Sequence, residues 1–223
     1  MKIILILLTV VFSLTISAQE ISQDVGDFSE LKVFDLVFVR LIQADENKVV
    51  VRGDYASDIK IINDDGVLKV RMHTDKRFRG EDTYIEVYAK SISVIDANEG
   101  SQITVSELIK QDKIELRVQE GAKINAALQV SFAKMKAVSG GMIDVNGLAR
   151  IQEIKINSGG IFDGKNLKTK DTKISVTAAG EAQVYASEKV DIRVTAGGNV
   201  YVHGNPVQVK KKRFAGGRIY IID

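Results

Sequence analysis

The chain has 223 residues, of which 45% are hydrophobic and 27% are charged, and its formal net charge is +2. The apolar fraction is typical of a globular protein and excludes a disordered chain. The absence of Cys excludes disulfide scaffolds, thiolate metal sites and thiol nucleophiles. The near-neutral charge gives no reason to expect a nucleic-acid partner. One feature is unusual, because 18 Gly accompany a single Pro.

Residues 1–18 have the pattern of a secretory signal peptide. Lys2 precedes an uncharged apolar run over residues 3–16, and the small residues Ser17 and Ala18 follow it. A cut after Ala18 would leave a mature chain of residues 19–223, exported to the periplasm, the cell surface or the medium, with no further span. A buried strand or a membrane anchor is the alternative, although the run is shorter than the roughly 20 residues that cross a bilayer.

Residues 19–90 contain short apolar runs without a regular period. The strands expected here are Leu31–Phe34, Leu36–Leu41, Val49–Arg52, Ile59–Ile62, Val67–Met72 and Tyr84–Tyr88. Between two of them, the sequence Asn-Asp-Asp-Gly at residues 63–66 predicts a tight hairpin turn. No helix is predicted in this segment.

Glycine recurs at a nearly constant spacing in residues 91–223. Seven marker glycines follow one another at almost equal intervals: Gly100, Gly121, Gly141, Gly160, Gly180, Gly198 and Gly217. A small residue stands two places before five of them, namely Ser139, Ser158, Ala178, Ala196 and Ala215. We interpret the glycines as corners of a repeated coil, with the small residues facing its crowded interior.

Alternating apolar and polar residues flank each marker. The run Ile114–Val118 precedes one marker and Val200–Val202 follows another. Alternation with a period of two predicts strands with one buried face. A weaker third apolar position follows in several repeats, at Leu108, Leu128, Leu148 and Leu167. Each repeat, a unit of about 19–20 residues, would therefore hold two clear strands and a weaker third one.

The constant spacing favours an all-β solenoid, a parallel β-helix of short coils. An antiparallel barrel or sandwich has no reason to repeat the same corner at a fixed interval, whereas stacked coils do. Residues 19–90 would then form a β cap over one end, since a terminal coil presents a free sheet edge. The expected organisation is a signal peptide (1–18), a cap (19–90) and repeats (91–223), the last two as one continuous domain.

Catalytic and metal-binding patterns are sparse. His73 and His203 lack acidic or histidine partners at ligand spacing, and neither a nucleophile elbow nor a phosphate-binding loop occurs. No metal, cofactor or catalytic residue is therefore assigned. Asp144 and Asp163 each stand three places after a marker and could lie on adjacent coils. Such a pair would suit a polysaccharide lyase or hydrolase, but the short coils leave no loops to wall a cleft.

Two surface features could bind a partner. Lys210, Lys211, Lys212, Arg213 and Arg218 form a candidate anion-binding patch, or else an edge kept soluble by its charge. Tyr185, Tyr201 and Tyr220 fall at similar places in three coils. They would form either a stripe for sugar stacking or a cross-strand ladder.

Segments near both ends of the chain resemble a known family. They are Gly26–Val33, Val49–Gly53 and Ala196–Pro206, with a closing pair at Gly216-Gly217. Over residues 26–222 the chain resembles the putative auto-transporter adhesin, head GIN domain family, although Gly-Gly or a single Gly stands where that family has Gly-Ser-Gly. The resemblance implies an exported right-handed parallel β-helix, and it carries over no catalytic residues.

Two functions from different classes follow. The first is an exported, non-catalytic module that binds a cell-surface glycan or protein, or serves as an envelope scaffold. The second is a carbohydrate-active enzyme, which would need two carboxylates facing one groove. Homo-oligomerisation through coil edges or the basic end is compatible with either function.

Overall fold

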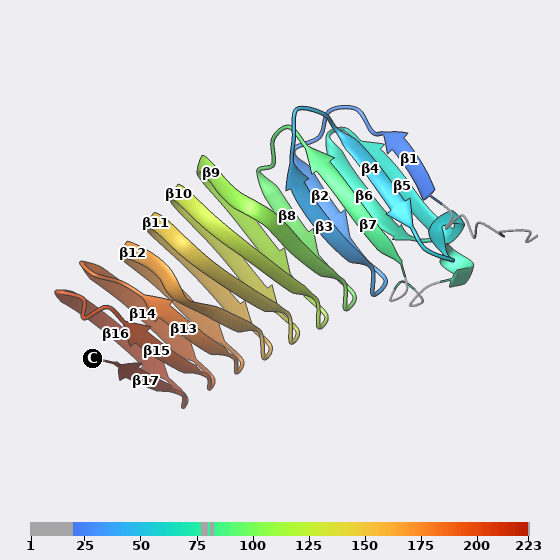
Figure 1. The fold of residues 1–223 in the computed structure, drawn as a ribbon. Coiled ribbons are helices and arrows are strands. Elements are labelled where there is room, and N and C mark those ends of the chain that lie inside the picture. Colours follow the sequence, from blue (N-terminus) through green and yellow to red (C-terminus); the bar gives the residue numbers. More distant parts are fainter. Residues whose placement is uncertain (1–19, 77–79, 81–82, 223) are drawn as a thin grey trace, which may run out of the picture.

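The computed structural model describes residues 20–76, 80 and 83–222 and consists almost entirely of β-strands. The strands wind into a β-solenoid of about seven turns, and the N-terminal part is less regular. Figure 1 shows the coils stacked side by side as a rod, with the N-terminal strands at one end and β17 at the other. The expected parallel β-helix of short coils is confirmed. No helix in the described part of the chain has the length and apolarity needed to cross a membrane.

The described residues of the N-terminal region form eight strands and two short 3-10 turns. They are β1 (Glu20–Asp24), β2 (Glu30–Val33), β3 (Phe38–Gln43), β4 (Lys48–Arg52), η1 (Ala56–Asp58), β5 (Ile59–Asp64), β6 (Val67–Met72), η2 (Thr74–Lys76), β7 (Tyr84–Ala89) and β8 (Val94–Ala97). The hairpin expected at residues 63–66 joins β5 and β6, which pair antiparallel. Leu36, expected in a strand, instead lies in a turn with φ of +61°.

Long bent strands form most of the repeat region. They are β9 (Gln102–Val118), β10 (Lys123–Val138), β11 (Met142–Asn157) and β12 (Ile161–Thr177). The last coils are split into β13 (Glu181–Tyr185), β14 (Lys189–Thr195), β15 (Asn199–His203), β16 (Gln208–Phe214) and β17 (Arg218–Ile221). Each coil therefore has two halves in parallel register with the halves of the next coil.

Apolar side chains of successive coils form columns inside the solenoid. One half of the coils contributes Ile103, Ile124, Ile143, Phe162, Ala182 and Val200. The other half contributes Leu116, Met135, Ile154, Ile174 and Ile192. All of these residues are at most 1% exposed. Burying a large apolar side chain contributes roughly 1.5–3 kcal/mol, so the stacked columns stabilise the fold without cross-links.

The third apolar position was misassigned by one residue in two coils. Leu108 and Leu148 are 45% and 55% exposed. The inward column at the bend consists of Ile109, Leu128 and Leu167, with Gly147 in register between the last two. A Cβ at Gly147 would lie 2.2 Å from the carbonyl oxygen of Leu128. The bend therefore leaves no room for a side chain in that coil, and the neighbouring leucine turns outward.

The turns between coils form a ladder of their own. In the turns at residues 99–100, 120–121, 139–140 and 158–159, two successive residues have positive φ, and the second is Gly. In the first three of these turns the second residue donates its N–H to the turn of the next coil, as Gly121 N does to Ser139 O at 3.1 Å. The small residues at the first turn position, such as Ser139 and Ser158, are exposed. The expectation that they face a crowded interior was wrong.

The coil formed by β2 and β3 is out of sequence order. β2 pairs in parallel with β6 and β8, while β3 pairs in parallel with β7 and β9. An early segment of the chain therefore lies between strands that come much later. Its turn at Asp35 and Leu36 also joins the ladder, because Leu36 N donates to Glu99 O at 3.0 Å. These pairings connect the less regular region directly to the first regular coil.

Candidate functional site

The seven marker glycines occupy two positions of the turn rather than one. Gly100 and Gly121 have positive φ and are equivalent to Gly140 and Gly159. The other five markers lie one residue later, where a Cβ would meet the preceding coil at 2.9 Å or less: Gly141, Gly160, Gly180, Gly198 and Gly217. At the first position glycine relieves the strain of a positive φ, which Ala179 nevertheless adopts in its coil. At the second position close packing leaves no room for a Cβ.

The five residues of the predicted anion patch do not face one direction. Side chains of the strand β16 alternate, so Lys210 and Lys212 point outward. Lys211 and Arg213 stand in register with the buried Ile192 and Val194. Arg218 belongs to the other half of the last coil, beside Asn199. The five cations therefore divide among several surfaces, and Lys210 is engaged by Asp191 at 3.4 Å.

A longer basic feature runs along the outward face of the second coil halves. Five successive coils align Lys136, Lys155, Ser175, Arg193 and Lys212 in register. Arg117 of β9 precedes Lys136 in the same row, and the acidic Asp96 of β8 precedes Arg117. We call the six residues from Arg117 to Lys212 the cation column. Neighbouring strands lie about 4.8 Å apart, so the row from Lys136 to Lys212 extends over about 19 Å.

Most cations of this column are free of ion pairs. Arg117 is held by Glu115 at 2.8 Å and by Glu30 at 3.4 Å. Among the residues that the structure describes, no carboxylate lies within 4 Å of the other four cations, which are all exposed: Lys136, Lys155, Arg193 and Lys212. The column thus presents four unpaired positive charges aligned in one row.

The adjacent row on the same face is organised differently. Its six residues alternate in sign: Glu115, Lys134, Glu153, Lys173, Asp191 and Lys210. Three cross-strand pairs form, of which Lys134 with Glu115 is the shortest at 3.2 Å. Opposite charges across strands stabilise a sheet and like charges destabilise it. The cation column therefore departs from the arrangement that stability alone would favour.

A depression lies in the middle of the cation column. Ser175 is short, and Lys155 and Arg193 stand on its two sides. The hollow has a volume of about 300 Å³ and is also lined by Lys173 and by the carboxylates of Glu153 and Asp191. On the far side of the column, the next outward row carries the amide and hydroxyl groups of Asn157, Thr177 and Thr195. This surface offers positive charge together with neutral hydrogen-bonding groups.

A second shallow hollow, of about 420 Å³, lies on the other face around Arg40 and Tyr84. Arg40 donates from Nε to Ser106 Oγ at 2.6 Å and from Nη1 to Tyr84 Oη at 3.4 Å. Glu86 accepts a 2.8 Å hydrogen bond from Arg52, which is the main cause that lowers the pKa of this carboxyl. The charged groups here largely satisfy one another, so this hollow is less open to a ligand than the cation column.

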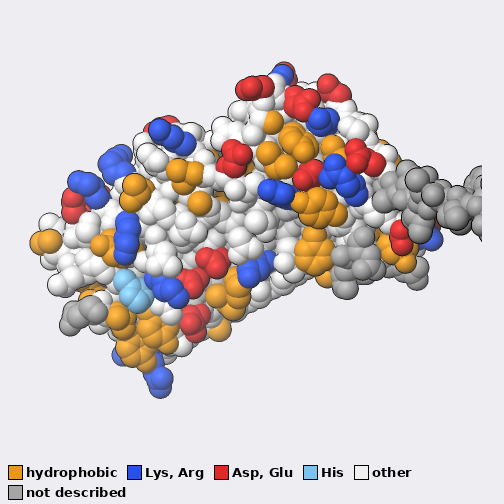
Figure 2. Space-filling model, in the orientation of Figure 1, with side chains coloured by type: hydrophobic (Ala, Val, Ile, Leu, Met, Phe, Trp, Pro, Cys, Tyr) orange, Lys and Arg blue, Asp and Glu red, His pale blue; other side chains and the backbone are white. Residues whose placement is uncertain are grey.

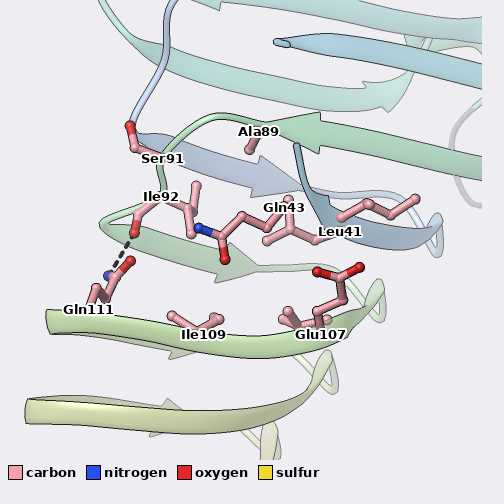
Figure 3. Close-up of a pocket in the computed structure, with 10 residues that line it drawn as sticks. Leu41, Gln43, Ala89, Ser91, Ile92, Glu107, Ile109 and Gln111 are labelled. Carbon is pink, nitrogen blue, oxygen red and sulfur yellow. Dashed lines mark hydrogen bonds between the residues drawn. The ribbon is translucent and has the colours of Figure 1, made fainter. Parts of the chain in front are cut away.

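The coil formed by β2 and β3, which we call the inserted coil, meets the first regular coil at an apolar slot. Figure 3 shows Leu41, Ala89, Ile92 and Ile109 around it, with Gln111 donating a 2.9 Å hydrogen bond to Ile92 O. The chain leaves the solenoid after Gln43, so this coil has no bend to fill the space. The free volume is only about 20 Å³, room for about one water molecule. The slot is a packing defect rather than a ligand site.

The predicted acidic pair does lie on adjacent coils. Asp144 and Asp163 are in register, and Asp163 forms an ion pair with Lys165 at 3.3 Å. The same row continues with Gln183, Tyr201 and Tyr220, so only two of its positions are acidic. Figure 2 shows the surface in that view as a rod of interspersed polar, charged and apolar side chains, without high walls around any of them.

The tyrosines form a short ladder, and His203 sits beside it. Tyr201 and Tyr220 stack with ring centroids 4.9 Å apart, whereas Tyr185 is in register with His203 instead. His203 Nε2 lies 2.8 Å from Gln183 Oε1. Burial and then Lys165 and Lys168 lower its pKa. Within the described ranges, no three His, Asp or Glu side chains gather as a metal site.

The sequence pattern could have located the cation column. Its charged members recur at one constant separation, at positions 117, 136 and 155 and again at 193 and 212. The prediction from the sequence rested on a contiguous run of charges and therefore missed this row. On a solenoid, neighbouring surface residues are one coil apart in the sequence.

Comparison with solved structures gives close matches over nearly the whole chain. A putative adhesin from Bacteroides fragilis is 15% identical with a TM-score of 0.84, and the alignment covers 93% of this chain and 98% of that one. A putative adhesin from Parabacteroides distasonis is 20% identical with a TM-score of 0.75, covering 92% and 97%. A putative lipid binding protein from the same species is 15% identical with a TM-score of 0.71, covering 94% and 98%. At these identities the likeness concerns the fold alone.

No curated protein matches the chain. The family model described as "Putative auto-transporter adhesin, head GIN domain" matches residues 27–206. That range takes in the inserted coil, the first regular coils and the glycine turns up to the lone Pro206. The chain belongs to this adhesin head GIN domain family.

Proposed function

We propose that the protein is an exported, non-catalytic binding module that attaches to a cell-surface partner in the manner of an adhesin. Membership of the adhesin family supports this role. The signal-like sequence at residues 1–18 supports export, and it lies outside the described residues. The periplasm, the cell surface and the medium are all compatible with such a module.

The observation that carries the proposal is the uniformity of the coils. The long strands β9 to β12 each have 16 or 17 residues, and short turns join them. Enzymes that act on polymers hold the scissile bond against their catalytic groups in a walled cleft. A rod with flat faces instead offers a long, open surface, which suits contact with an extended partner.

Cell binding tests this function directly. Purified protein of residues 19–223, labelled with a fluorophore, is titrated onto a panel of bacterial and epithelial cells. We expect saturable binding that unlabelled protein competes away. Absence of binding to every cell type would contradict the adhesin-like role and leave an envelope scaffold as the remaining function.

A separate assay addresses the enzymatic alternative. The register of Asp144 and Asp163 is the one observation that favours it. We expect no product from polyuronates or neutral polysaccharides. Product formation that the variant Asp144→Asn/Asp163→Asn abolishes would overturn the non-catalytic assignment.

A further inference from the structure

We propose that the cation column binds a linear acidic polysaccharide laid along the solenoid axis. This inference rests on the proposed function, since it names the partner class of the same binding module. It depends on the register of the column, on its unpaired charges and on the groups that flank it.

The spacing of the cations matches a linear polyanion. Free cations stand at the first, second, fourth and fifth positions of the row from Lys136 to Lys212. Their separations of about 5 and 10 Å along the axis are comparable to the Debye length of about 8 Å at physiological salt. Their potentials therefore add along one line, and a polymer with regularly spaced acidic groups can contact several of them at once.

The column is costly to the fold, which argues for a role outside it. Lys136 and Lys155 are direct cross-strand neighbours, as are Arg193 and Lys212. Like charges in such positions destabilise a sheet, whereas the adjacent row alternates acids and bases. Local departures from the stabilising pattern are expected at functional sites. A bound polyanion would relieve the repulsion between these neighbours.

The flanking groups favour a polysaccharide over an anionic membrane. On one side stand the amide and hydroxyls of Asn157, Thr177 and Thr195, which can hydrogen-bond to sugar hydroxyls. On the other side, Lys173 and Lys210 neutralise Glu153 and Asp191, so the unpaired positive charge is confined to a single row. The hollow over Ser175 gives room for a sugar ring between Lys155 and Arg193, with Glu153 and Asp191 as further hydrogen-bond acceptors for its hydroxyls. A linear chain matches this single row of charge, whereas a lipid plane would also cover the neutral rows beside it.

The test measures binding to heparin and polygalacturonate, used as probes of sulfated and carboxylated chains. Residues 19–223 are compared with the variants Lys155→Glu/Arg193→Glu and Lys60→Glu/Lys110→Glu. Lys60 and Lys110 are exposed and lie away from the column, and both double variants change the net charge equally. Circular dichroism and thermal melting confirm that each variant is folded.

We expect the wild-type protein to bind at least one probe, with affinity that falls as salt is added. Lys155→Glu/Arg193→Glu should weaken binding about tenfold or more, and the control pair should change it by less than about twofold. Ser175→Lys fills the gap in the row and should tighten binding about threefold. Equal losses in the two double variants would overturn the proposal, because they would show a response to net charge alone.

Two further outcomes separate this inference from the proposed function. Binding to cells by the wild type and by Lys155→Glu/Arg193→Glu alike would overturn the cation column while leaving the adhesin-like role intact. Binding to the probes without binding to any cell would support the column and contradict that role.

Binding to phosphatidylserine vesicles but to neither polysaccharide would overturn the proposal in favour of a membrane partner.

Discussion

The N-terminal region and the repeat region build the same coils in different ways. From β9 onward each coil pairs with the coil that follows it in sequence. In the N-terminal region, β2 lies between β6 and β8, and β3 between β7 and β9. The difference shows that a solenoid does not require consecutive winding. What each strand needs is a neighbour on each side and an apolar inner face.

The largest effect should come from the inserted coil. Leu31 is fully buried between Leu68 and Ile95, which flank it in register. Leu31→Ala should lower the free energy of unfolding by about 2–5 kcal/mol, because it leaves a cavity in the core. Hydrogen exchange should show lost protection in both β6 and β8.

Ile219 in the half-buried β17 gives the matched comparison. Ile219→Ala should cost less, and its loss of protection should stay within the last coils. If both substitutions reduced hydrogen-exchange protection in β6 equally, the inserted and terminal coils would not differ in their effect on the fold.

The two glycine positions of the turn should differ in a smaller but measurable way. A Cβ at Gly160 would lie 2.3 Å from Ala137 O, so Gly160→Ala should cost about 3 kcal/mol through overpacking. Gly159 has φ of +77° and nothing within 4 Å of an added Cβ. Gly159→Ala should cost only the left-handed backbone strain, about 1 kcal/mol. Chemical denaturation measures both, and a reversed order would refute the two-position assignment.

The smallest change in stability should come from substituting Glu99, which lies where the inserted coil meets the regular coils. Burial and then contact with Asp35 raise the pKa of Glu99, and Glu120 adds repulsion while Arg71 opposes the shift. The folded state therefore holds the Glu99 proton more tightly than the unfolded chain, whose pKa is near 4.5. Stability is then greatest at low pH and falls as pH rises from 4.5 through the raised pKa.

Glu99→Gln should accordingly raise the midpoint of urea unfolding at pH 7 and flatten its dependence on pH above the unfolded-state pKa. Glu120 has the same turn position one coil later and is exposed. Glu120→Gln should change both quantities much less, because it removes only the weakest of the interactions that raise the pKa of Glu99. If Glu99→Gln lowered the urea midpoint at pH 7, it would contradict the conclusion that the charged carboxylate of Glu99 destabilises the folded state.

Sequence reasoning predicted the repeated coils because their neighbours lie at a constant separation along the chain. Ile143 and Phe162, for example, follow equivalent turns and stack in register. The inserted coil could not be predicted in this way. β2 contacts strands at unrelated separations, and its turn uses Asp35 and Leu36 in place of a glycine pair. Tertiary contacts support that turn, because Asp35 is fully buried beside Met72 N and Arg71, and Leu36 N donates to Glu99 O.

The cation column was partly predictable, because its members also recur at a constant separation along the chain. The contiguous run at residues 210–213 drew attention to the last coil, but alternation along β16 sends its members in opposite directions. Lys212 alone joins the cation column, and its partners are one coil away. The hollow over Ser175 depends on side-chain size at one register position, which becomes visible only when the coils are aligned.

The inward residues of the last coil have a consequence for how long the rod can be. Where β14 places Ile192 and Val194, β16 places Lys211 and Arg213, and its whole length is exposed. A further strand of the usual apolar kind would have to bury these two charges, which is strongly unfavourable without partners. The pair therefore acts as a terminator of stacking. The pair thereby limits the proposed cation column to the coils that end at Lys212.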